Sequence, residues 1–379
     1  MAKYRLGDIC EIVSGSTPKT SVEEYWDGEI KWITPAELTD DSYIITDSAR
    51  KITKLGVQKT GLSSFPKGTV ILSSRAPIGK VAIAGCEMYC NQGFKNLICS
   101  DKINNKYLYW FLKGNTAYLN SLGRGATLKE ISKQIVSAIE INVPSKEEQQ
   151  KTVDTLEKIN DIISLRKREI NQLDNLVKAR FVEMFGEEYK KVTADEVCTA
   201  IIDCPHSTPK YDETELKYPA IRTSEIQNGT INWASMKYVG PIEYEKRIKR
   251  LRPIAGDIVY AREGTYGDCV ILPSNAEFCL GQRTMLFRPD ERICTSVYLH
   301  AVLRSEKVKR QADESNAGST VPHVNVADAK KFYFALPPLE LQEQFSAFVA
   351  QVDKSKVAVQ KALDEAQLLF DSLMQEYFR

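Results

Sequence analysis

Residues 144–186 read PSKEEQQKTVDTLEKINDIISLRKREINQLDNLVKARFVEMFG, and the architecture of the chain follows from them. Ser145 and Glu148 form a capping box, in which each side chain satisfies one of the first backbone N–H groups of a helix. Apolar residues then recur every seven positions, and the run ends at Gly186, a residue suited to a helix terminus. An unbroken helix of about 41 residues is ~60 Å long and cannot lie inside a small domain. The pattern therefore predicts a long helix that extends beyond its own globule.

A second helix of this kind is predicted near the end of the sequence. Pro144 has a counterpart in Pro337, 193 residues further on, and the apolar stripe of the first helix reappears at the same offset. The second stripe is interrupted by Lys356, but a companion stripe runs beside it. We expect the two helices to pair antiparallel, because this arrangement cancels their dipoles. The residues assigned to this pairing are Leu156, Ile163, Ile170, Leu173, Val177, Met184, Val352, Val359, Leu363, Phe370, Leu373 and Tyr377.

The rest of the sequence also occurs twice. Gly125-Ala-Thr127 and Gly318-Ser-Thr320, again 193 residues apart, each lead into alternating apolar residues and a proline. Nearer the start of each repeat, Thr17-Pro-Lys19 matches Thr208-Pro-Lys210. Short runs rich in Val and Ile, bounded by Gly or Pro, predict strands, and helical stretches lie between them. The sequence thus predicts two similar α+β domains joined by two long antiparallel coiled-coil helices, with pseudo-twofold symmetry.

Length and composition agree with this reading. The 379 residues are too many for one ordinary core, and 43% hydrophobic with 27% charged residues is typical of a folded globular chain. No apolar run approaches the ~18 residues of a membrane span, and the first residues lack the apolar run of a secretion signal, so we expect a cytoplasmic protein. The nine cysteines are scattered and the three histidines lie far from any cysteine pair, so we expect reduced thiols and no metal site.

The near-neutral net charge of +1 conceals an alternation along the chain. Residues 1–144 and 190–336 are mildly basic, whereas residues 145–189 and 337–379 are acidic. Contacts with a polyanion are therefore expected on the first and third segments. The sequence has no phosphate-binding Gly-x-x-x-x-Gly-Lys-Ser/Thr loop and no Asn/Asp-Pro-Pro-aromatic signature of amino-group methyltransferases. We accordingly expect no catalysis by this chain and no cofactor in it.

Polar loops at matching places in the two repeats are the candidate DNA contacts. Arg, Lys, Asn and Gln read base edges through paired hydrogen bonds, and Ser, Thr and loop amides bind phosphate. One such loop often does no more than turn the chain, but recurrence in both repeats favours a shared role. The candidates are Ser16, Thr17, Lys19, Arg75, Asn91, Gln92, Arg124, Thr127, Ser207, Thr208, Lys210, Tyr211, Arg262, Tyr266, Gln282, Arg283, Asn316 and Thr320. A basic run adds the candidate phosphate contacts Lys246, Arg247, Lys249 and Arg250, although a solvated surface would explain that run nearly as well.

Four loose motifs occur in the same order in both repeats. They are Gly15-Ser-Thr-Pro18 with His206-Ser-Thr-Pro209, Trp32-Ile33-Thr34 with Ile221-Arg-Thr223, Arg75–Gly79 with Arg262–Gly267, and Pro144…Glu148-Gln149 with Pro338…Glu343-Gln344. In this order the whole chain resembles the DNA specificity (S) subunit of type I restriction-modification systems. The second repeat departs from the family pattern by having His206 where the loop glycine would stand.

The resemblance implies a division of the chain into four parts. These are a target recognition domain at 1–144, a central conserved-region helix at 145–186, a second recognition domain at 187–336 and a C-terminal conserved-region helix at 337–379. Each recognition domain is then expected to read one half of a bipartite site in double-stranded DNA, and the helices to set the spacer.

The resemblance also implies partners. The helices are expected to dock two methyltransferase subunits, which use S-adenosylmethionine, and further restriction subunits would bring ATP- and magnesium-dependent translocation and cleavage. Two other readings stay open from the residues alone. One is a self-contained methyltransferase or nuclease, and the other is a coiled-coil adaptor that binds only proteins.

Overall fold

The computed structural model describes residues 2–75, 77–125, 129–186, 189–214, 216–264, 266–315 and 323–378. The chain divides into two compact units. Unit 1 combines Met1–Lys167 with Lys361–Arg379, and unit 2 comprises Arg168–Gln360. Both long helices therefore contribute one part to each unit.

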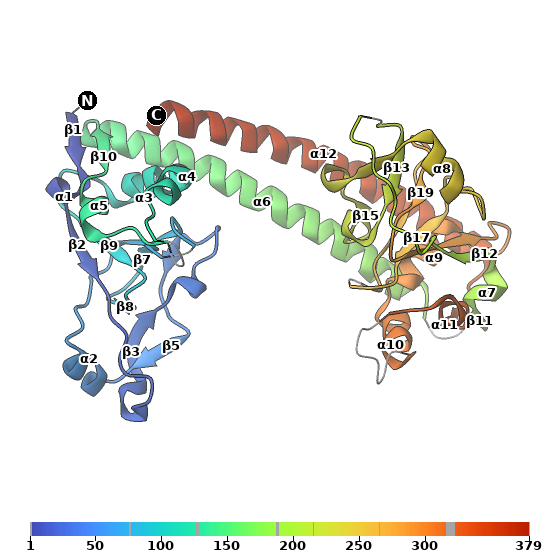
Figure 1. The fold of residues 1–379 in the computed structure, drawn as a ribbon, viewed down its shortest axis with the longest axis horizontal. Coiled ribbons are helices and arrows are strands. Elements are labelled where there is room, and N and C mark those ends of the chain that lie inside the picture. The colour runs from blue at the N-terminus through green and yellow to red at the C-terminus, as the bar shows by residue number, and fades with distance from the viewer. Residues whose placement is uncertain are drawn as a thin grey trace. The chain divides into compact units, whose positions relative to one another are not determined.

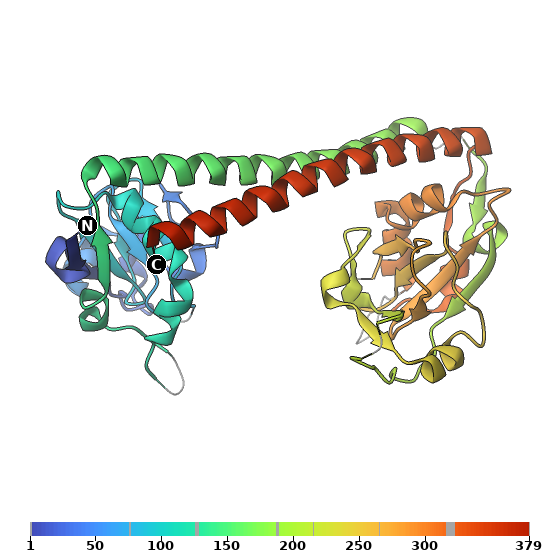
Figure 2. The same ribbon diagram turned by 90° about the horizontal axis from the view of Figure 1, so that it is seen from above.

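The two predicted long helices are present. Helix α6 spans Lys146–Met184 and α12 spans Leu339–Phe378, and both run without a break (Figure 2). The capping box of α6 forms as predicted, because the Ser145 amide donates to Glu148 Oε2 at 3.1 Å and the Glu148 amide donates to Ser145 Oγ at 3.2 Å. The hydrogen bonds from Ser145 also hold the pKa of Glu148 below its usual range. Among the described residues, no helix is both long enough and apolar enough to cross a membrane.

Unit 1 is built from three sheets and short helices (Figure 1). The strand orders are β2-β9-β6-β7-β4, β5-β3-β8 and β1-β10. Its elements, besides 3₁₀ turns at Glu23–Tyr25 and Pro35–Glu37, are β1 (Ala2–Arg5), α1 (Leu6–Ile9), β2 (Cys10–Ser14), β3 (Trp26–Ile33), β4 (Ile44–Ile45), β5 (Arg50–Ile52), α2 (Lys54–Thr60), β6 (Val70–Leu72), β7 (Val81–Ala84), β8 (Tyr89–Cys90), β9 (Lys95–Cys99), α3 (Asn105–Gly114), α4 (Thr116–Ser121), α5 (Lys133–Ser137) and β10 (Glu140–Val143).

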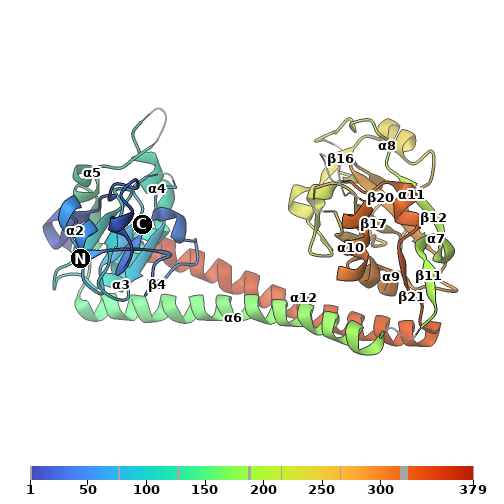
Figure 3. The ribbon, with the colours of Figure 1, turned by 90° about the horizontal axis from the view of Figure 1, so that it is seen from below.

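Unit 2 repeats this plan (Figure 3). The strand orders β12-β20-β17-β18, β16-β13-β19 and β11-β21 correspond to those of unit 1 except that no strand among the described residues matches β4, and β14-β15 is an added hairpin. Its elements, besides 3₁₀ turns at Thr223–Glu225 and Trp233–Ser235, are β11 (Lys191–Thr193), α7 (Ala194–Val197), β12 (Cys198–Asp203), β13 (Tyr218–Ile221), β14 (Ile226–Gln227), β15 (Thr230–Ile231), β16 (Lys237–Val239), α8 (Pro241–Arg247), β17 (Ile258–Ala261), β18 (Cys269–Ile271), β19 (Cys279–Leu280), β20 (Thr284–Pro289), α9 (Ser296–Leu303), α10 (Glu306–Ser315), α11 (Val326–Lys330) and β21 (Tyr333–Ala335). The predicted pair of similar α+β units with two long helices is confirmed.

One side chain attaches each long helix to its unit in the same way. Gln149 of α6 is fully buried, and its Nε2 donates to the carbonyl oxygens of Lys102 at 3.1 Å and Pro144 at 3.0 Å. Its Oε1 accepts from the amide of Asn104, the residue that caps α3, at 2.7 Å. Gln342 of α12 repeats these three contacts with Ile293, Pro337 and Thr295 at 3.1, 2.9 and 2.9 Å. Gln149 and Gln342 stand 193 residues apart, the offset between Pro144 and Pro337, so the repeat predicts this pair and the structure confirms it. Only the looser motif match of Gln149 with Gln344 was wrong.

The side chains of the predicted apolar stripes are shielded from solvent along both long helices. Each residue assigned to helix pairing is buried or half-buried, and Leu156 has no exposed surface. The ends of the helices also join the globular cores. In unit 1 the Phe370 ring lies 5.5 Å from that of Trp110 on α3, and in unit 2 the Phe181 ring lies 5.7 Å from that of Phe345. The stripes thus fix each helix end to its globule as well as to the other helix.

Candidate nucleic-acid interface

The first polar loop of unit 1 follows β2 and lies against the end of β8. The Ser16 amide donates to the Cys90 carbonyl oxygen at 3.0 Å. A Cβ at Gly15 would overlap the carbonyl oxygens of Cys90 and Asn91, so only glycine allows the loop to come this close. The glycine of the predicted Gly-Ser-Thr-Pro motif is therefore required by a close approach of two backbones.

Two tryptophan indoles donate hydrogen bonds to the backbone of the same loop. The indole N–H of Trp32 donates to the Ser16 carbonyl oxygen at 3.0 Å, and that of Trp26 donates to the Lys19 carbonyl oxygen at 3.3 Å. The two rings meet edge to face with centroids 5.1 Å apart, and the Arg50 guanidinium lies 3.7 Å above Trp26. Sequence analysis placed Trp32 only in a strand motif and did not single out Trp26, so it missed both supports.

Side chains of two loops meet in the same way in each unit. Thr17 Oγ1 donates to Gln92 Oε1 in unit 1, and Gln282 Nε2 donates to Thr208 Oγ1 at 2.8 Å in unit 2. Both pairs join the loop after the first strand of a sheet to the loop that follows β8 or β19. Lys19 and Gln92 of unit 1 are exposed beside the first pair, and Ser207, Thr208 and Lys210 of unit 2 are exposed beside the second. The structure therefore gathers candidates from separate parts of each repeat at one place.

Arg75, Lys95 and Glu130 form a small charged cluster in unit 1. Arg75 Nε donates to Glu130 Oε2 at 2.8 Å, and Lys95 Nζ lies 3.2 Å from Glu130 Oε1. Burial raises the pKa of Glu130, but its hydrogen bonds with Arg75 and Lys95 prevail and lower it below the usual range. The backbone of Arg124 bonds to that of Glu130 in both directions, so the exposed Arg124 side chain lies beside this cluster.

The structure corrects one correspondence between the repeats. The Ser74 amide donates to the carbonyl oxygen of Gly93 in unit 1, and the Arg262 amide donates to that of Arg283 in unit 2. The backbones of Arg75 and Glu130 form an isolated antiparallel β-bridge in unit 1, as those of Glu263 and His323 do in unit 2. The equivalent of Arg75 is therefore Glu263, and the match of Arg75 with Arg262 was wrong by one residue.

Arg262 is also engaged within its own unit. Its side chain is 12% exposed and forms an ion pair with Asp203, whose side chain is 13% exposed. Arg283 is the more accessible cation, with a side chain 66% exposed and Nε 3.0 Å from Glu263 Oε2. Arg283 has φ of 62°, a left-handed conformation that is strained for a residue other than glycine. The strained backbone presents an exposed guanidinium next to Gln282.

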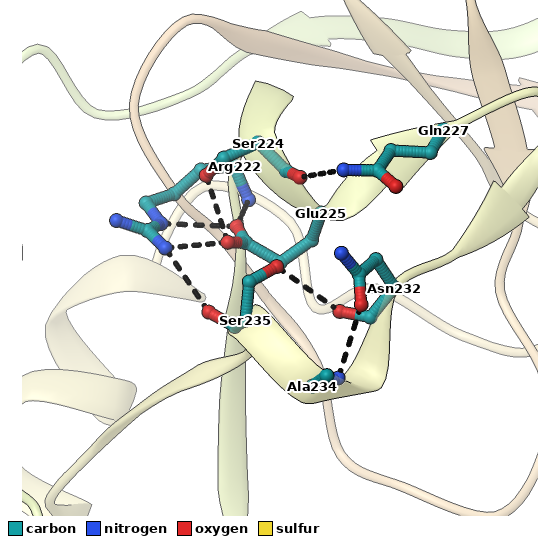
Figure 4. A network of polar contacts seen from close by, with 7 residues as sticks. All are labelled: Arg222, Ser224, Glu225, Gln227, Asn232, Ala234 and Ser235. Carbon is teal, nitrogen blue, oxygen red and sulfur yellow. Dashed lines mark hydrogen bonds and ion pairs between the residues drawn. The ribbon is translucent and has the colours of Figure 1, made fainter. Parts of the chain in front are cut away.

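A partly buried ion pair between Arg222 and Glu225 lies near the loops of unit 2 (Figure 4). Arg222 Nε donates to Glu225 Oε2 at 2.9 Å, and the Arg222 amide donates to the same oxygen at 2.9 Å. Glu225 has no exposed surface, and the Arg222 guanidinium lies 5.5 Å from the Tyr211 ring. Thr34 and Glu37 form the corresponding capping box in unit 1, with the Thr34 amide donating at 2.8 Å. The equivalent of Thr34 is therefore Arg222, and the motif match of Thr34 with Thr223 was wrong by one residue.

The basic run of unit 2 separates into exposed and buried members. Lys246, Lys249 and Arg250 are exposed, as a phosphate contact requires. Arg247 does not fit the predicted phosphate contact, because its side chain is 1% exposed and bonded within the unit. Tyr266 is half-buried with its hydroxyl on Asp313. Three candidates, Thr127, Asn316 and Thr320, lie outside the described residues.

The described residues hold no group of three or more His, Cys, Asp or Glu side chains that could bind a metal ion. What the sites do offer are Arg, Lys, Gln, Ser and Thr donors on loops anchored to sheets. Such donors, present in both units of one chain, are of the kind that hydrogen-bond to phosphates and base edges of DNA.

Comparison with known proteins identifies the family. The family described as "Type I restriction modification DNA specificity domain" matches residues 1–175 and 186–366. The chain is 28% identical to the type I restriction enzyme MjaIX specificity subunit of Methanocaldococcus jannaschii over 411 residues, which cover 98% of this chain and 90% of that one. The HindI specificity subunit of Haemophilus influenzae is 28% identical over 177 residues, 44% of this chain and 38% of that one.

Solved structures show the same fold. The type I restriction-modification S subunit from M. genitalium matches with a TM-score of 0.58 at 15% identity, over 100% of this chain and 96% of that one. A chain from a structure titled as the basis of complex assembly and conformational transition of a type I system matches with a TM-score of 0.59 at 18% identity, over 100% of this chain and 97% of that one. The chain belongs to the type I restriction-modification DNA specificity family.

Proposed function

We propose that this chain gives a type I restriction-modification complex its DNA sequence specificity, with each unit reading one half of a bipartite site. The observation that carries the proposal is the repeated loop pair. Thr17 with Gln92 in unit 1 and Thr208 with Gln282 in unit 2 join equivalent loops, and exposed donors surround both pairs. Side chains that are fixed before binding read base edges with less loss of conformational freedom than mobile ones.

The long helices have a second role in the proposal, which is to set the spacer between half-sites and to dock two methyltransferase subunits. Large apolar side chains stay exposed on both helices after the stripes are buried. They are Ile162, Leu165, Leu176, Val182, Val357, Leu368 and Leu369. Exposed large apolar side chains on long helices supply surface that a protein partner can cover, which supports docking on these helices.

The chemistry in this proposal belongs to the partners. Methyltransferase subunits would use S-adenosylmethionine to modify adenine, and restriction subunits would use ATP and magnesium. The chain itself would act without catalysis, by holding the DNA so that the partners reach the correct bases.

A genome-wide map of modified adenines tests the proposal. Cells with and without this gene are compared, and we expect deletion to remove a two-part, gapped methyladenine motif. An unchanged map, together with no site-specific DNA binding by the chain purified with its methyltransferase partners, would contradict the proposal. That pair of results would favour the protein-binding adaptor instead.

A further inference from the structure

The loops Gly15-Ser-Thr-Pro18 and His206-Ser-Thr-Pro209, here called the recognition loops, are held by different side chains. In unit 1, the Trp32 indole donates to the Ser16 carbonyl oxygen, and the Ser16 amide donates to the carbonyl oxygen at the end of β8. In unit 2 the matching loop begins His206-Ser-Thr, and its histidine stands where unit 1 requires glycine. A loop with a side chain at that position needs another means of attachment.

Arg247, the last residue of α8, supplies this attachment. Its Nε donates to the Leu280 carbonyl oxygen at 2.8 Å, at the end of β19. Its two terminal nitrogens donate to the carbonyl oxygens of Ser207 at 3.2 Å and Pro205 at 3.4 Å. One guanidinium thus connects the recognition loop to the strand below it. Three donors in a rigid plane suit such a connection, which a lysine could not reproduce.

The strand register shows that unit 2 has no tryptophan at the position of Trp32. Trp32 pairs with Tyr89 and Ile33 with Cys90 across the parallel strands of unit 1. In unit 2, Ala220 pairs with Cys279 and Ile221 with Leu280 in the same manner. Ala220 therefore occupies the place of Trp32, and its small side chain removes the indole that supported the loop of unit 1.

The helix that follows shows the complementary change. Helix α2 of unit 1 ends at Thr60, whereas α8 of unit 2 ends at Arg247. The tryptophan of β3 in unit 1 is replaced by alanine in β13 of unit 2, and the threonine that ends α2 is replaced by the arginine that ends α8. Both arrangements deliver an N–H group to the same acceptor, since Ser16 and Ser207 hold the same place in the two loops.

The charge of Arg247 is compensated where it is buried. Glu243, one turn earlier on α8, lies 3.4 Å from one terminal nitrogen, and the three carbonyl oxygens surround the rest of the group. A buried guanidinium stays ionised and holds its partners strongly when its hydrogen bonds are complete. Removing it would leave two loop carbonyls without a donor.

We infer that Arg247 is the positioning residue of the second recognition loop, and that it controls which bases unit 2 reads without touching DNA. The inference rests on the proposed function. Because Ser207, Thr208 and Lys210 are carried by the loop that Arg247 holds, its loss would affect the half-site of unit 2 and leave that of unit 1 unchanged.

The test uses the full chain purified with its methyltransferase partners. Selection from a pool of duplexes with randomised cores first defines the gapped site for the wild type. Each variant is then measured on three duplexes, which carry the intact site, a scrambled first half or a scrambled second half. The half-site assigned to unit 1 is the one whose reading changes in the variant Trp32→Phe, which removes the indole N–H together with its five-membered ring.

We expect Arg247→Met to reduce discrimination at the second half-site by about tenfold, since two charged hydrogen bonds to the loop are lost, with discrimination at the first half unchanged. Ala220→Trp/Arg247→Thr, which rebuilds the support of unit 1, should recover part of that loss. If Arg247→Met does not fold, Arg247→Lys makes the same comparison.

Unchanged discrimination at the second half, or an equal loss at both halves, would overturn the inference. A wild-type complex that selects no gapped site would instead contradict the proposed function, so the two failures are distinguishable.

Discussion

Two buried glutamines contribute to the attachment of the long helices to the units, and the size of their contribution is open to measurement. Replacing Gln149 by alanine removes three hydrogen bonds and leaves the carbonyl oxygens of Lys102 and Pro144 and the amide of Asn104 without a buried partner. At about 1 kcal/mol for each of three bonds, unit 1 should lose ~3 kcal/mol of unfolding free energy. With a urea slope of about 2 kcal/mol per M, its midpoint would fall by ~1.5 M.

Tryptophan fluorescence follows this unit selectively. Trp26, Trp32 and Trp110 lie in unit 1, and the fourth tryptophan, Trp233, lies in unit 2. Gln150→Ala is the matched control, because that neighbouring side chain is exposed and its hydrogen bonds are made in water. We expect the control to shift the midpoint by less than a third as much.

An isosteric variant makes the reasoning sharper. Gln149→Glu keeps the acceptor for Asn104 but aims a carboxylate oxygen at the carbonyl oxygens of Lys102 and Pro144. Protonation would restore one donor, so this variant should regain stability relative to the wild type as the pH falls toward 5. The account of the anchor is refuted if Gln149→Ala and Gln150→Ala shift the midpoint equally, or if the Gln149→Glu deficit does not depend on pH.

Three further predictions concern other parts of the chain. Gly15→Ala should weaken reading of one half-site at least tenfold in the duplex assay, since its Cβ overlaps two carbonyl oxygens, whereas His206→Ala, at the position where unit 2 carries a side chain, should change binding much less. Burial lowers the pKa of His300 to about 4 from its ordinary value near 6.5. The neutral ring therefore stabilises unit 2 above pH 6.5 by up to about 3 kcal/mol, and this stabilisation is lost as the pH falls to 4. Urea unfolding of wild type and His300→Asn at pH 7 and 4.5 checks this, and a free-energy difference that stays constant would count against it. Inserting one heptad, ~10 Å, in both helices should widen the spacer in the adenine map without altering either half-site. An unchanged spacer would contradict the proposal that the helices set its length.

The helices and the repetition were predictable because they rest on long-range regularity. A capping box at Ser145, a seven-residue stripe and a constant offset between repeats each sum many weak signals. The polar loops were also located, since Gly15 and the Thr-Pro-Lys sequences mark turns in both repeats. These signals do not show which side chains are buried, because the exposure of a side chain depends on neighbours that are remote in the sequence.

Arg247 shows this limit most clearly. Among Lys246, Lys249 and Arg250 it reads as one more surface cation, yet it is buried, because its place on α8 faces β19 rather than solvent. Motif matching failed for a related reason. Arg75 was matched to Arg262 by residue type, but the backbone hydrogen bonds of the strands fix Glu263 as its equivalent, and residue type carries no information on strand register.

The supports of the two loops bear on how the halves of such a chain can diverge. The loop of unit 1 depends on Trp32, and that of unit 2 on Arg247, a residue 40 positions from the Ser207 it holds. A recognition loop is therefore not a separable module, since grafting the His206 loop into unit 1 would force a side chain against the carbonyl oxygens of Cys90 and Asn91 that approach Gly15. A whole unit, in contrast, contains loop, strand and helix together. Exchange of specificity should accordingly succeed at the scale of residues 1–144 and fail at the scale of a single loop, because the physical contacts that fix the loop are spread over the unit.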